Sequence, residues 1–264
     1  MEIEAPLIAR ERKPGQFIIL QIDTEMGERI PLTIADADPM KGTVTLVVQA
    51  VGRTTHLLAE KQVGDTVPAL LGPLGAPTHI ARVGHVVCVG GGVGVAPMHP
   101  IAQGMKAAGN KVTIIIGART KELVIMEEEM RRIADELIIV TDDGSYGRKG
   151  LVTHPLKELC EQSPKPDMAV IIGPPIMMKF AAETTRPYGV PTVVSLNTIM
   201  IDGTGMCGGC RVTVGGETKF VCVDGPEFDG HQVDFDNMMK RQSAYKAREG
   251  EDHQAYHKCN IGLS

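Results

Sequence analysis

The pattern of apolar and polar positions changes near residue 83. Before this point, short alternating or β-branched runs, such as residues 17–22 and 43–50, are separated by glycine and proline. Runs of this kind are typical of short strands joined by turns, and none of them requires a helix of normal length. The pattern therefore predicts a small antiparallel β-barrel over residues 1–82.

From residue 85 onward, apolar strands alternate with helical stretches, such as the helix predicted over residues 122–136. The predicted buried strands begin at His85, Lys111, Leu137, Met168 and Thr192. Because apolar strands with helical crossovers form open parallel sheets, we expect an α/β domain with a five-stranded parallel sheet over residues 83–196. Ligands bind such sheets at the carboxyl ends of the strands, where this chain places glycines and charged residues.

A glycine-rich segment, G-G-G-V-G-V-A-P at residues 90–97, follows the first of these strands directly. It precedes a predicted helix that has Pro97 in its first turn. Backbone N–H groups of such a loop and the positive end of the helix can hold a pyrophosphate. This predicts phosphate binding by Gly91, Gly92, Val93 and Gly94. The segment is not G-x-G-x-x-G, so glycines that only permit a tight turn are the alternative.

Three of the six cysteines lie between residues 201 and 222, in the spacing D-x4-C-x2-C-x11-C. This is the plant-type iron-sulfur spacing with a carboxylate in place of the first thiolate. It predicts a 2Fe-2S cluster bound by Asp202, Cys207, Cys210 and Cys222. The glycines at positions 203, 205, 208 and 209 would let the backbone approach the cluster closely. Residues 197–264 would then form a cluster module and a polar tail.

Two other interpretations of the cysteine segment stay open. A zinc-knuckle nucleotide-binding protein could use the three thiolates with Asp202, His231 or Cys259, although zinc sites usually show a second matched pair of ligands. A dithiol redox switch could use Cys207 and Cys210, but this pair does not open a helix after a predicted strand.

Composition narrows the class of protein. A formal charge of -5 without a basic cluster argues against nucleic acid as a partner. No apolar run of the sequence reaches the length of a membrane span, and the N-terminus lacks the regions of a signal peptide, so we expect a cytoplasmic protein and no membrane partner. In such a protein, unevenly spaced cysteines are typical of reduced thiols and of metal ligands. We expect Cys88 and Cys160 to lie in the core.

The polar C-terminal segment carries weaker signals. Residues 236–248 are compatible with one helix. The isolated histidines His231, His253 and His257 are expected to be solvated side chains.

The predicted sites differ in how many electrons they handle. A nicotinamide dinucleotide carries two electrons at once, whereas a 2Fe-2S cluster accepts one. Flavin exchanges electrons either singly or in pairs, and the N-terminal barrel is the segment left to hold it. The sequence therefore predicts three redox centres in line, which are NAD(H), FAD and the cluster.

The segments G-G-G-V-G-V-A-P at 90, G-A-R at 117, T-D-D-G-S-Y-G at 141, G-P-P-I-M-M at 173 and the cysteine segment, in this order, resemble the ferredoxin reductase-like electron-transfer subunits. Within them, the chain is similar to the electron-transfer subunit of dihydroorotate dehydrogenase, and more closely to the small subunit of NADH-dependent ferredoxin:NADP oxidoreductase. Asp202 favours the second group, because the dihydroorotate enzyme has cysteine there. The resemblance covers nearly the whole chain. It implies electron bifurcation with a larger FAD and 4Fe-4S subunit that binds NADP(H) and exchanges electrons with ferredoxin.

The resemblance also assigns residues to the cofactors. A segment against the flavin ring corresponds to Ile30, Pro31, Leu32 and Thr33, with Ile30 in place of the family's arginine. The stretch that continues along FAD corresponds to Val48, Gln49, Ala50, Arg53, Thr54 and Thr55, and the turn that closes the site runs from Gly72 to Gly75. The NAD(H) motifs add Gly117, Arg119, Asp142, Asp143, Gly173 and Pro174. Arg119 and Lys121 would suit a 2′-phosphate, but the resemblance favours NAD(H). No side chain is expected to act as acid or base, because catalysis would rest on placing nicotinamide against flavin.

Overall fold

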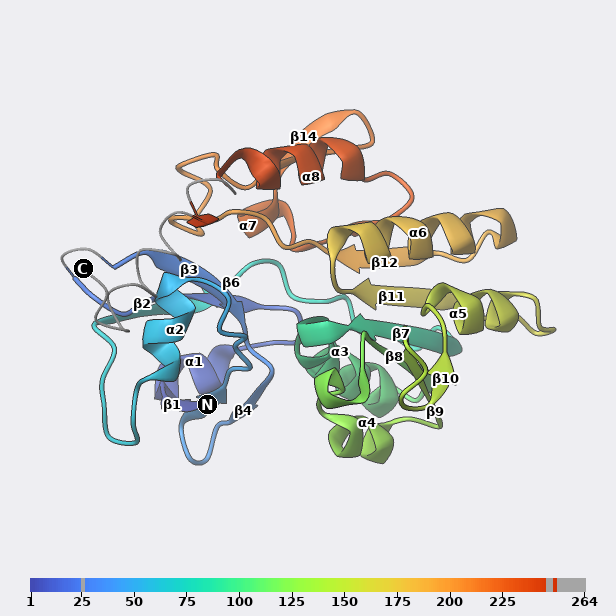
Figure 1. Ribbon diagram of the computed structural model, residues 1–264, viewed down its shortest axis with the longest axis horizontal. Helices are drawn as coiled ribbons and strands as arrows, with labels where there is room; N and C mark the ends of the chain where they lie inside the picture. The colour runs from blue at the N-terminus through green and yellow to red at the C-terminus, as the bar shows by residue number, and fades with distance from the viewer. Residues whose placement is uncertain (25–26, 246–248, 251–264) are drawn as a thin grey trace.

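The computed structural model describes residues 1–24, 27–245 and 249–250. Its N-terminal part contains two three-stranded antiparallel sheets, drawn in blue and cyan in Figure 1. The first has the strand order β3 (Arg29–Thr33), β2 (Phe17–Gln21) and β6 (Ala69–Leu74). The second has the order β1 (Glu2–Glu4), β5 (Thr43–Thr45) and β4 (Asp36–Asp38).

Strand β2 is buried on both faces, which explains its continuous apolar run. Ile18 and Leu20 pack in the core of the N-terminal part, whereas Phe17 and Ile19 join the core of the rest of the chain. Two short helices cover the N-terminal sheets, α1 (Pro6–Glu11) and α2 (Arg53–Ala59). The antiparallel strands expected over residues 1–82 are therefore present, in two sheets.

The second part is built on a seven-stranded sheet with the order β10-β9-β8-β7-β11-β12-β15. The predicted parallel strands are β7 (His85–Gly91), β8 (Lys111–Ala118), β9 (Glu136–Thr141), β11 (Met168–Ile172) and β12 (Thr192–Ser195). The expectation of five strands was incomplete, because β10 (Arg148–Lys149) and the antiparallel β15 (Glu227–Asp229) extend the edges. Strands this short show no measurable periodicity in the sequence.

Helices cover both faces of this sheet (Figure 1). One face carries α3 (Val95–Ala107) and α4 (Glu127–Ile133), and the other carries α5 (Thr153–Cys160) and α6 (Pro175–Thr185). Neighbouring residues of β7 alternate between the two, since Cys88 packs on the α3 side and Val89 on the α6 side. Short 3-10 turns complete the unit at η1 (Gly92–Gly94), η2 (Lys121–Leu123) and η3 (Arg186–Tyr188).

The helix predicted over residues 122–136 was too long. Helix α4 ends at Ile133, and Glu136 already belongs to β9. Asp135 explains the early end, because its carboxylate accepts hydrogen bonds from the Val112 N–H and from Lys106 Nζ and so draws the chain to the sheet.

The sheet changes direction of winding between β7 and β11. The chain adds β8 and β9 on one side of β7, then returns to place β11 and β12 on the other side. Loops on opposite faces diverge from this point and leave a crevice outside the carboxyl ends of the strands. The glycine segment after β7 and Gly173 after β11 meet there, since a Cβ added to Gly94 would lie 2.8 Å from the Gly173 Cα.

The third part contains the hairpin β13 (Arg211–Val214) and β14 (Glu217–Phe220), followed by α7 (Val221–Asp224) and α8 (Phe235–Gln242). The helix expected over 236–248 is thus shorter, and η4 (Ser243–Tyr245) follows it, while residues 246–248 lie outside the described residues. His231 is not simply solvated, because its ring lies 3.0 Å from the Thr185 hydroxyl. His253, His257 and Cys259 also lie outside the described residues. None of the helices in the described ranges is long and apolar enough to cross a membrane.

Candidate nucleotide cleft and cluster loop

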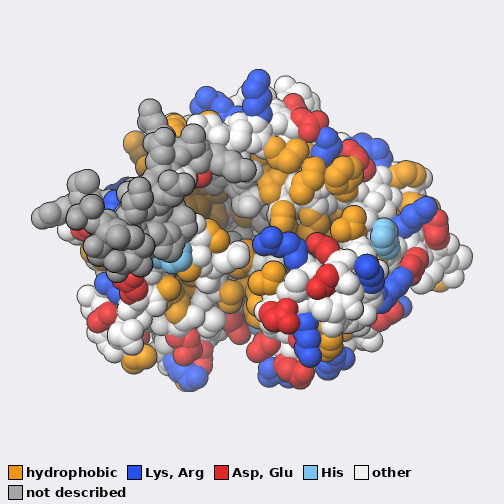
Figure 2. Space-filling view, viewed as in Figure 1, with side chains coloured by type: hydrophobic (Ala, Val, Ile, Leu, Met, Phe, Trp, Pro, Cys, Tyr) orange, Lys and Arg blue, Asp and Glu red, His pale blue; other side chains and the backbone are white. Residues whose placement is uncertain are grey.

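A cleft of about 1020 Å³ opens where the N-terminal sheets meet the carboxyl ends of the parallel strands. Its lining comes from β3, from the segment after β5, from the loops after β7, β8, β9 and β11, and from residues 195–200. A cleft of this size can enclose a large organic cofactor. Figure 2 shows hydrophobic side chains gathered on the surface over α6, and this helix contributes the exposed Ile176 and Phe180 to the cleft.

The glycine segment is shaped for a ligand on one side and for close packing on the other. Gly92 has φ +55°, and apart from its neighbours in the chain no atom of the described residues lies within 4 Å of the place where a Cβ would be. Gly94, two residues later, is packed so closely that an added Cβ would lie 2.5 Å from the carbonyl oxygen of Ile172. Helix α3 begins at Val95 with Pro97 in its first turn, as expected. The backbone of this segment is therefore open to the cleft and tightly fixed behind it.

The structure brings together most of the residues predicted to bind a cofactor. Those that line the cleft are Pro31, Leu32, Thr33, Val48, Gln49, Gly91, Gly92, Val93, Gly94, Gly117, Arg119, Asp142, Gly173 and Pro174. The structure places the other predicted residues away from this lining: Ile30, Ala50, Arg53, Thr54, Thr55, Gly72, Gly75 and Asp143. Whether any of these residues binds a cofactor stays a prediction.

Local hydrogen bonds explain several of the outlying positions. The Asp143 carboxylate accepts from the N–H and the hydroxyl of Ser145, so it closes its own turn, and the backbone hydrogen bond is the main cause that lowers the pKa of Asp143. The Thr54 hydroxyl donates to Glu28, and the Thr55 hydroxyl bonds with the backbone at the start of α2. Gly75 lies one layer behind the cleft, because a Cβ there would meet the ring of Phe17.

Sequence reasoning missed the segment between β12 and the cysteine loop. Ser195, Leu196, Asn197, Thr198 and Met200 all line the cleft. The Thr198 Oγ1 atom is buried and finds no hydrogen-bond partner among the described residues. A buried hydroxyl without a partner is costly, which marks this atom as a contact for a ligand. The segment has no glycine motif or periodicity that could have indicated it.

The cysteine loop lies directly after this segment. Cys210 and Cys222 are buried, and their sulfur atoms are 3.3 Å apart. Burial and the hydrogen bond with Cys210 raise the pKa of Cys222 to about 12. Cys207 is exposed, and its sulfur accepts from the Gly209 N–H at 3.4 Å. Two thiols are thus brought together in the interior by residues from both sides of the β13–β14 hairpin.

Asp202 lies at the other side of the same loop. Its carboxylate accepts from the backbone N–H groups of Thr204 and Cys207 at 3.0 and 2.9 Å, and these bonds lower the pKa of Asp202. Gly203 permits this turn, because it has φ +73° and a Cβ there would lie 2.8 Å from side chains of Ile19 and Leu74. Within the described ranges, no three His, Cys, Asp or Glu side chains are grouped so as to hold one metal ion.

Helix α8 links the loop to the cleft. Arg241 donates to the carbonyl of Gly209 in the loop at 3.4 Å, and Gln242 donates to the carbonyl of Asn197 in the cleft lining.

Cys88 and Cys160 are buried in the core as predicted, and burial raises the pKa of both thiols.

A carboxyl group lies where all three parts of the chain meet. Thr78, which follows the N-terminal sheets, donates its hydroxyl to Glu227 Oε1 at 2.5 Å. Glu227 pairs with Ser195 across β15 and β12, and a Cβ added to Gly15 would lie 2.9 Å from the same carboxyl. Burial raises the pKa of Glu227 above its ordinary value, against the opposing effect of the Thr78 hydrogen bond.

This shift predicts how stability depends on pH. Because the folded-state pKa of Glu227 is raised, the contribution of its carboxyl to folding stability is fully present below the ordinary pKa of 4.5. This contribution is lost as the pH rises through the raised value. Glu227→Gln keeps the shape of the side chain and can still accept from Thr78. We expect this variant to lose less folding stability than the native chain as the pH rises. Thermal melts from pH 4 to 8 would measure the difference, with the exposed Glu217→Gln as control. A stability difference between the native chain and the Glu227→Gln variant that stays constant with pH would contradict this prediction.

Comparison with known proteins connects this architecture to a family. Residues 88–183 match the oxidoreductase NAD-binding domain, and residues 197–234 match the iron-sulfur cluster binding domain of dihydroorotate dehydrogenase B. A relative from Thermotoga maritima, described as an electron transfer subunit homolog of dihydroorotate dehydrogenase B (NAD(+)), is 51% identical over 247 residues, which cover 94% of this chain and 86% of the relative. The chain belongs to the dihydroorotate dehydrogenase B electron-transfer subunit family.

Two further comparisons extend the family. The electron transfer subunit from Bacillus caldolyticus is 36% identical over 241 residues, covering 88% of this chain and 91% of the relative. A chain in the solved structure of NADH-dependent reduced ferredoxin-NADP oxidoreductase, studied for flavin-based electron bifurcation, has 48% identity and a TM-score of 0.91, over 97% of this chain and 92% of that one. This electron-transfer subunit is therefore an oxidoreductase with the ferredoxin reductase-like fold, and it has domains for NAD and for an iron-sulfur cluster.

Proposed function

We propose that this subunit passes electrons between NAD(H), FAD and a 2Fe-2S cluster, and on to a larger partner in an electron-bifurcating NADH-dependent ferredoxin:NADP oxidoreductase. The observation that carries the proposal is one cleft shared by the glycine segment and the flavin segment, joined through residues 195–200 to the cysteine loop. The similarity to the ferredoxin-NADP oxidoreductase chain supports this choice of enzyme. The N-terminal sheets would form the FAD-binding barrel over residues 1–82, with the NAD domain at 83–196 and the cluster module at 197–264.

The cleft fits a flavin beside a nicotinamide. The unpartnered Thr198 hydroxyl would bond with the flavin, and the open backbone at Gly92 would receive the pyrophosphate of NAD(H). When bound, the flavin would supply the exchange between two-electron and one-electron transfer. The protein's part is to orient both rings and to exclude water, which the apolar side chains of Phe17, Leu32 and Met177 in the lining would do.

The cysteine loop fits a 2Fe-2S cluster by its donor set. Three thiols and one carboxylate carry the charge of four thiolates, but an oxygen donor is harder than sulfur. The sulfurs of Cys210 and Cys222 are already close in the interior, whereas Asp202 is half-buried and Cys207 is exposed. Metal would keep all three thiols deprotonated, against the burial that raises the pKa of Cys222.

The exposed side of the loop supports a protein partner. Met206 is 87% exposed next to Cys207, and Ile201 and Val223 are exposed apolar side chains of the same loop and of α7. Apolar surface of this kind is typical of a contact with another protein. The larger partner would carry FAD and 4Fe-4S clusters, bind NADP(H) and exchange electrons with ferredoxin. The assembly would be cytoplasmic, without nucleic acid or membrane.

The second candidate is the electron-transfer subunit of an NAD-dependent dihydroorotate dehydrogenase. The names of the relatives favour it, whereas Asp202 disfavours it. Co-purification of the partner from the native source, with assays of dihydroorotate oxidation and of NADP-dependent ferredoxin reduction, separates the two.

The experiment that tests the proposal is a visible spectrum of the anaerobically purified chain, with iron, sulfide and zinc analysis. We expect flavin bands and about two iron and two sulfide per chain, bleached on addition of NADH. Stoichiometric zinc in a colourless protein would reject the proposal and support a zinc-knuckle nucleotide-binding protein.

The fit of the flavin predicts a role for the unpartnered hydroxyl. Thr198→Val removes Oγ1 at nearly constant volume, and the loss of one hydrogen bond should weaken FAD binding by about two- to tenfold. Fluorescence titration of the apoprotein with FAD would measure this. Thr184→Val on α6, where the hydroxyl donates to the carbonyl of Phe180 in its own helix, is the control. Equal FAD affinity in the native chain and the Thr198 variant would show that this hydroxyl does not contact the flavin.

A further inference from the structure

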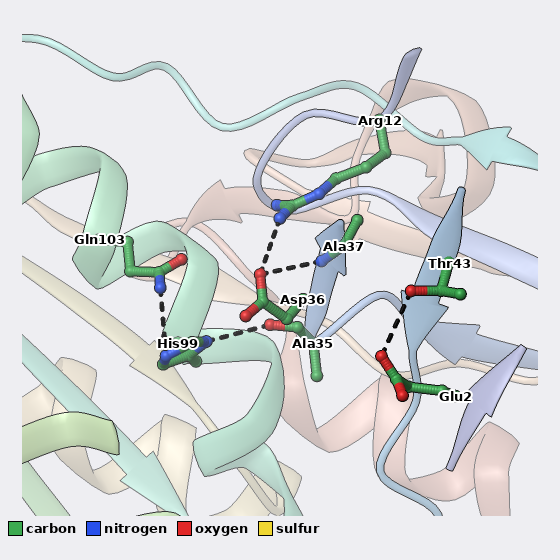
Figure 3. A network of polar contacts seen from close by, with 8 residues as sticks. All are labelled: Glu2, Arg12, Ala35, Asp36, Ala37, Thr43, His99 and Gln103. Atoms are coloured by element: carbon green, nitrogen blue, oxygen red, sulfur yellow. Dashed lines mark hydrogen bonds and ion pairs between the residues drawn. The ribbon is translucent and has the colours of Figure 1, made fainter. Parts of the chain in front are cut away.

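Helix α3 is tied to the N-terminal part through a buried histidine. His99, in the second turn of α3, is 4% exposed, and its Nδ1 lies 3.1 Å from the carbonyl oxygen of Ala35 (Figure 3). A carbonyl oxygen can only accept, so Nδ1 carries the proton in this bond. Nε2 then accepts from the side-chain amide of Gln103, 3.3 Å away. The bond joins residues that are 64 positions apart in the sequence.

The acceptor is held in place from several directions. Ala35 is fully buried, and its own N–H donates to the carbonyl of Thr45 at 2.9 Å. The next residue, Asp36, accepts with one carboxylate oxygen from Arg12 at 3.1 Å and from the Ala37 N–H at 2.8 Å, as Figure 3 shows. The carbonyl that receives the histidine bond therefore belongs to a rigid segment.

The donor lies on a part of α3 that has fewer bonds of its own. Pro100 has no N–H to give to the carbonyl of Ala96, so one hydrogen bond of the first turns is missing. Ala96 and Pro97, the last two residues of the glycine segment, line the cleft. An external bond at His99 therefore contributes to fixing the beginning of this helix.

We propose that His99 is a positioning residue for the electron transfer between NADH and FAD, an inference that rests on the proposed function. One end of its bond is two residues after Thr33 in the predicted flavin segment, and the other is five residues after Gly94 in the predicted phosphate loop. The bond thus sets the separation of the two walls that hold the rings. With both cofactors bound, hydride transfer would convert NADH to NAD⁺ and, with one proton from solvent, would convert oxidised FAD to its two-electron reduced form. This needs the reacting atoms about 3–3.5 Å apart, and the rate is sensitive to small displacements.

The test compares His99→Phe, which keeps an aromatic ring but has no donor, with His99→Asn, whose amide can donate to Ala35. Both are prepared as the full chain loaded with FAD and cluster. Stopped-flow measurement of flavin reduction by NADH should show a limiting rate about tenfold lower for the phenylalanine variant. We expect the Kd for NADH to stay constant, the long-wavelength charge-transfer absorbance of the NADH–flavin complex to weaken, and asparagine to restore both rate and absorbance.

A matched variant and an activity-independent measurement complete the test. His85→Phe removes another histidine bond, to Thr113 at 2.9 Å, at the opposite end of β7 from the cleft, and it should leave the rate unchanged. Hydrogen exchange of the FAD-loaded chain without NADH should rise in residues 91–99 of the His99→Phe variant alone. A native rate and absorbance in the phenylalanine variant at equal FAD content would overturn the inference. Native protein that NADH does not bleach would instead reject the proposed function.

Discussion

Replacement of Cys222 by serine should remove the iron-sulfur cluster from the chain while FAD stays bound. The sulfur of Cys222 lies 3.3 Å from that of Cys210 in a buried position, and serine would replace this soft sulfur donor by a harder oxygen donor. We expect iron and sulfide to fall from about two per chain to nearly none. The electron paramagnetic resonance signal of the reduced cluster should disappear, while NADH still bleaches the flavin.

A second buried cysteine provides the control. Cys160 packs in the core on α5, away from the loop, and Cys160→Ser changes the same atom in a similar environment. It should keep the full iron content. Full iron in the Cys222→Ser variant, with an unchanged spectrum, would show that this residue is no ligand and would reopen the other interpretations of the cysteine segment.

Replacement of Gly94 by alanine should nearly abolish the reaction with NADH. The added Cβ would lie 2.5 Å from the Ile172 carbonyl oxygen and 2.8 Å from the Gly173 Cα, and neither backbone atom can rotate away. Either the glycine segment or the end of β11 must shift, which costs about 1–3 kcal/mol of stability. Because both segments line the cleft, the efficiency of flavin reduction by NADH should fall roughly a hundredfold. Stopped-flow kinetics and denaturant unfolding would measure the two effects.

Gly109→Ala separates the loss of stability from the loss of function. Gly109 lies just after α3 with φ +85°, and a Cβ there would approach Arg82 no closer than 3.9 Å. The strain of this conformation costs about 1–2 kcal/mol, comparable to the Gly94 variant, but it is remote from the cleft. Native kinetics in the Gly109 variant, with impaired kinetics in the Gly94 variant, is the expected outcome. Equal kinetics in the two would mean that the glycine segment does not hold NADH.

The pattern of apolar residues along the chain predicted those parts of the fold that depend on residues close together in the sequence. The apolar runs of β7, β8, β9, β11 and β12 predicted the parallel strands, and the first four of these strands have residues in the cores on both faces of the sheet. The same reasoning predicted a helix longer than α4 and missed β10 and β15. These ends depend on contacts from elsewhere, such as the bond from Val112 to Asp135.

The candidate site divides in the same way. The glycine segment and the cysteine spacing were visible because close backbone approach and metal binding demand particular residue types at fixed intervals. Thr198 carried no such signal, since a threonine in a connecting segment becomes informative only when its hydroxyl is seen to be buried without a partner.

The sequence by itself determined the order of the three parts, the parallel strands, the glycine segment and the cysteine spacing, because each is encoded within a short stretch of chain. Only the tertiary structure decided which predicted residues share the cleft, and which contacts join the parts. His99 meets Ala35 across 64 positions, and Thr78 meets Glu227 across 149. Such contacts follow from the packing of whole sheets and helices, which no local periodicity records.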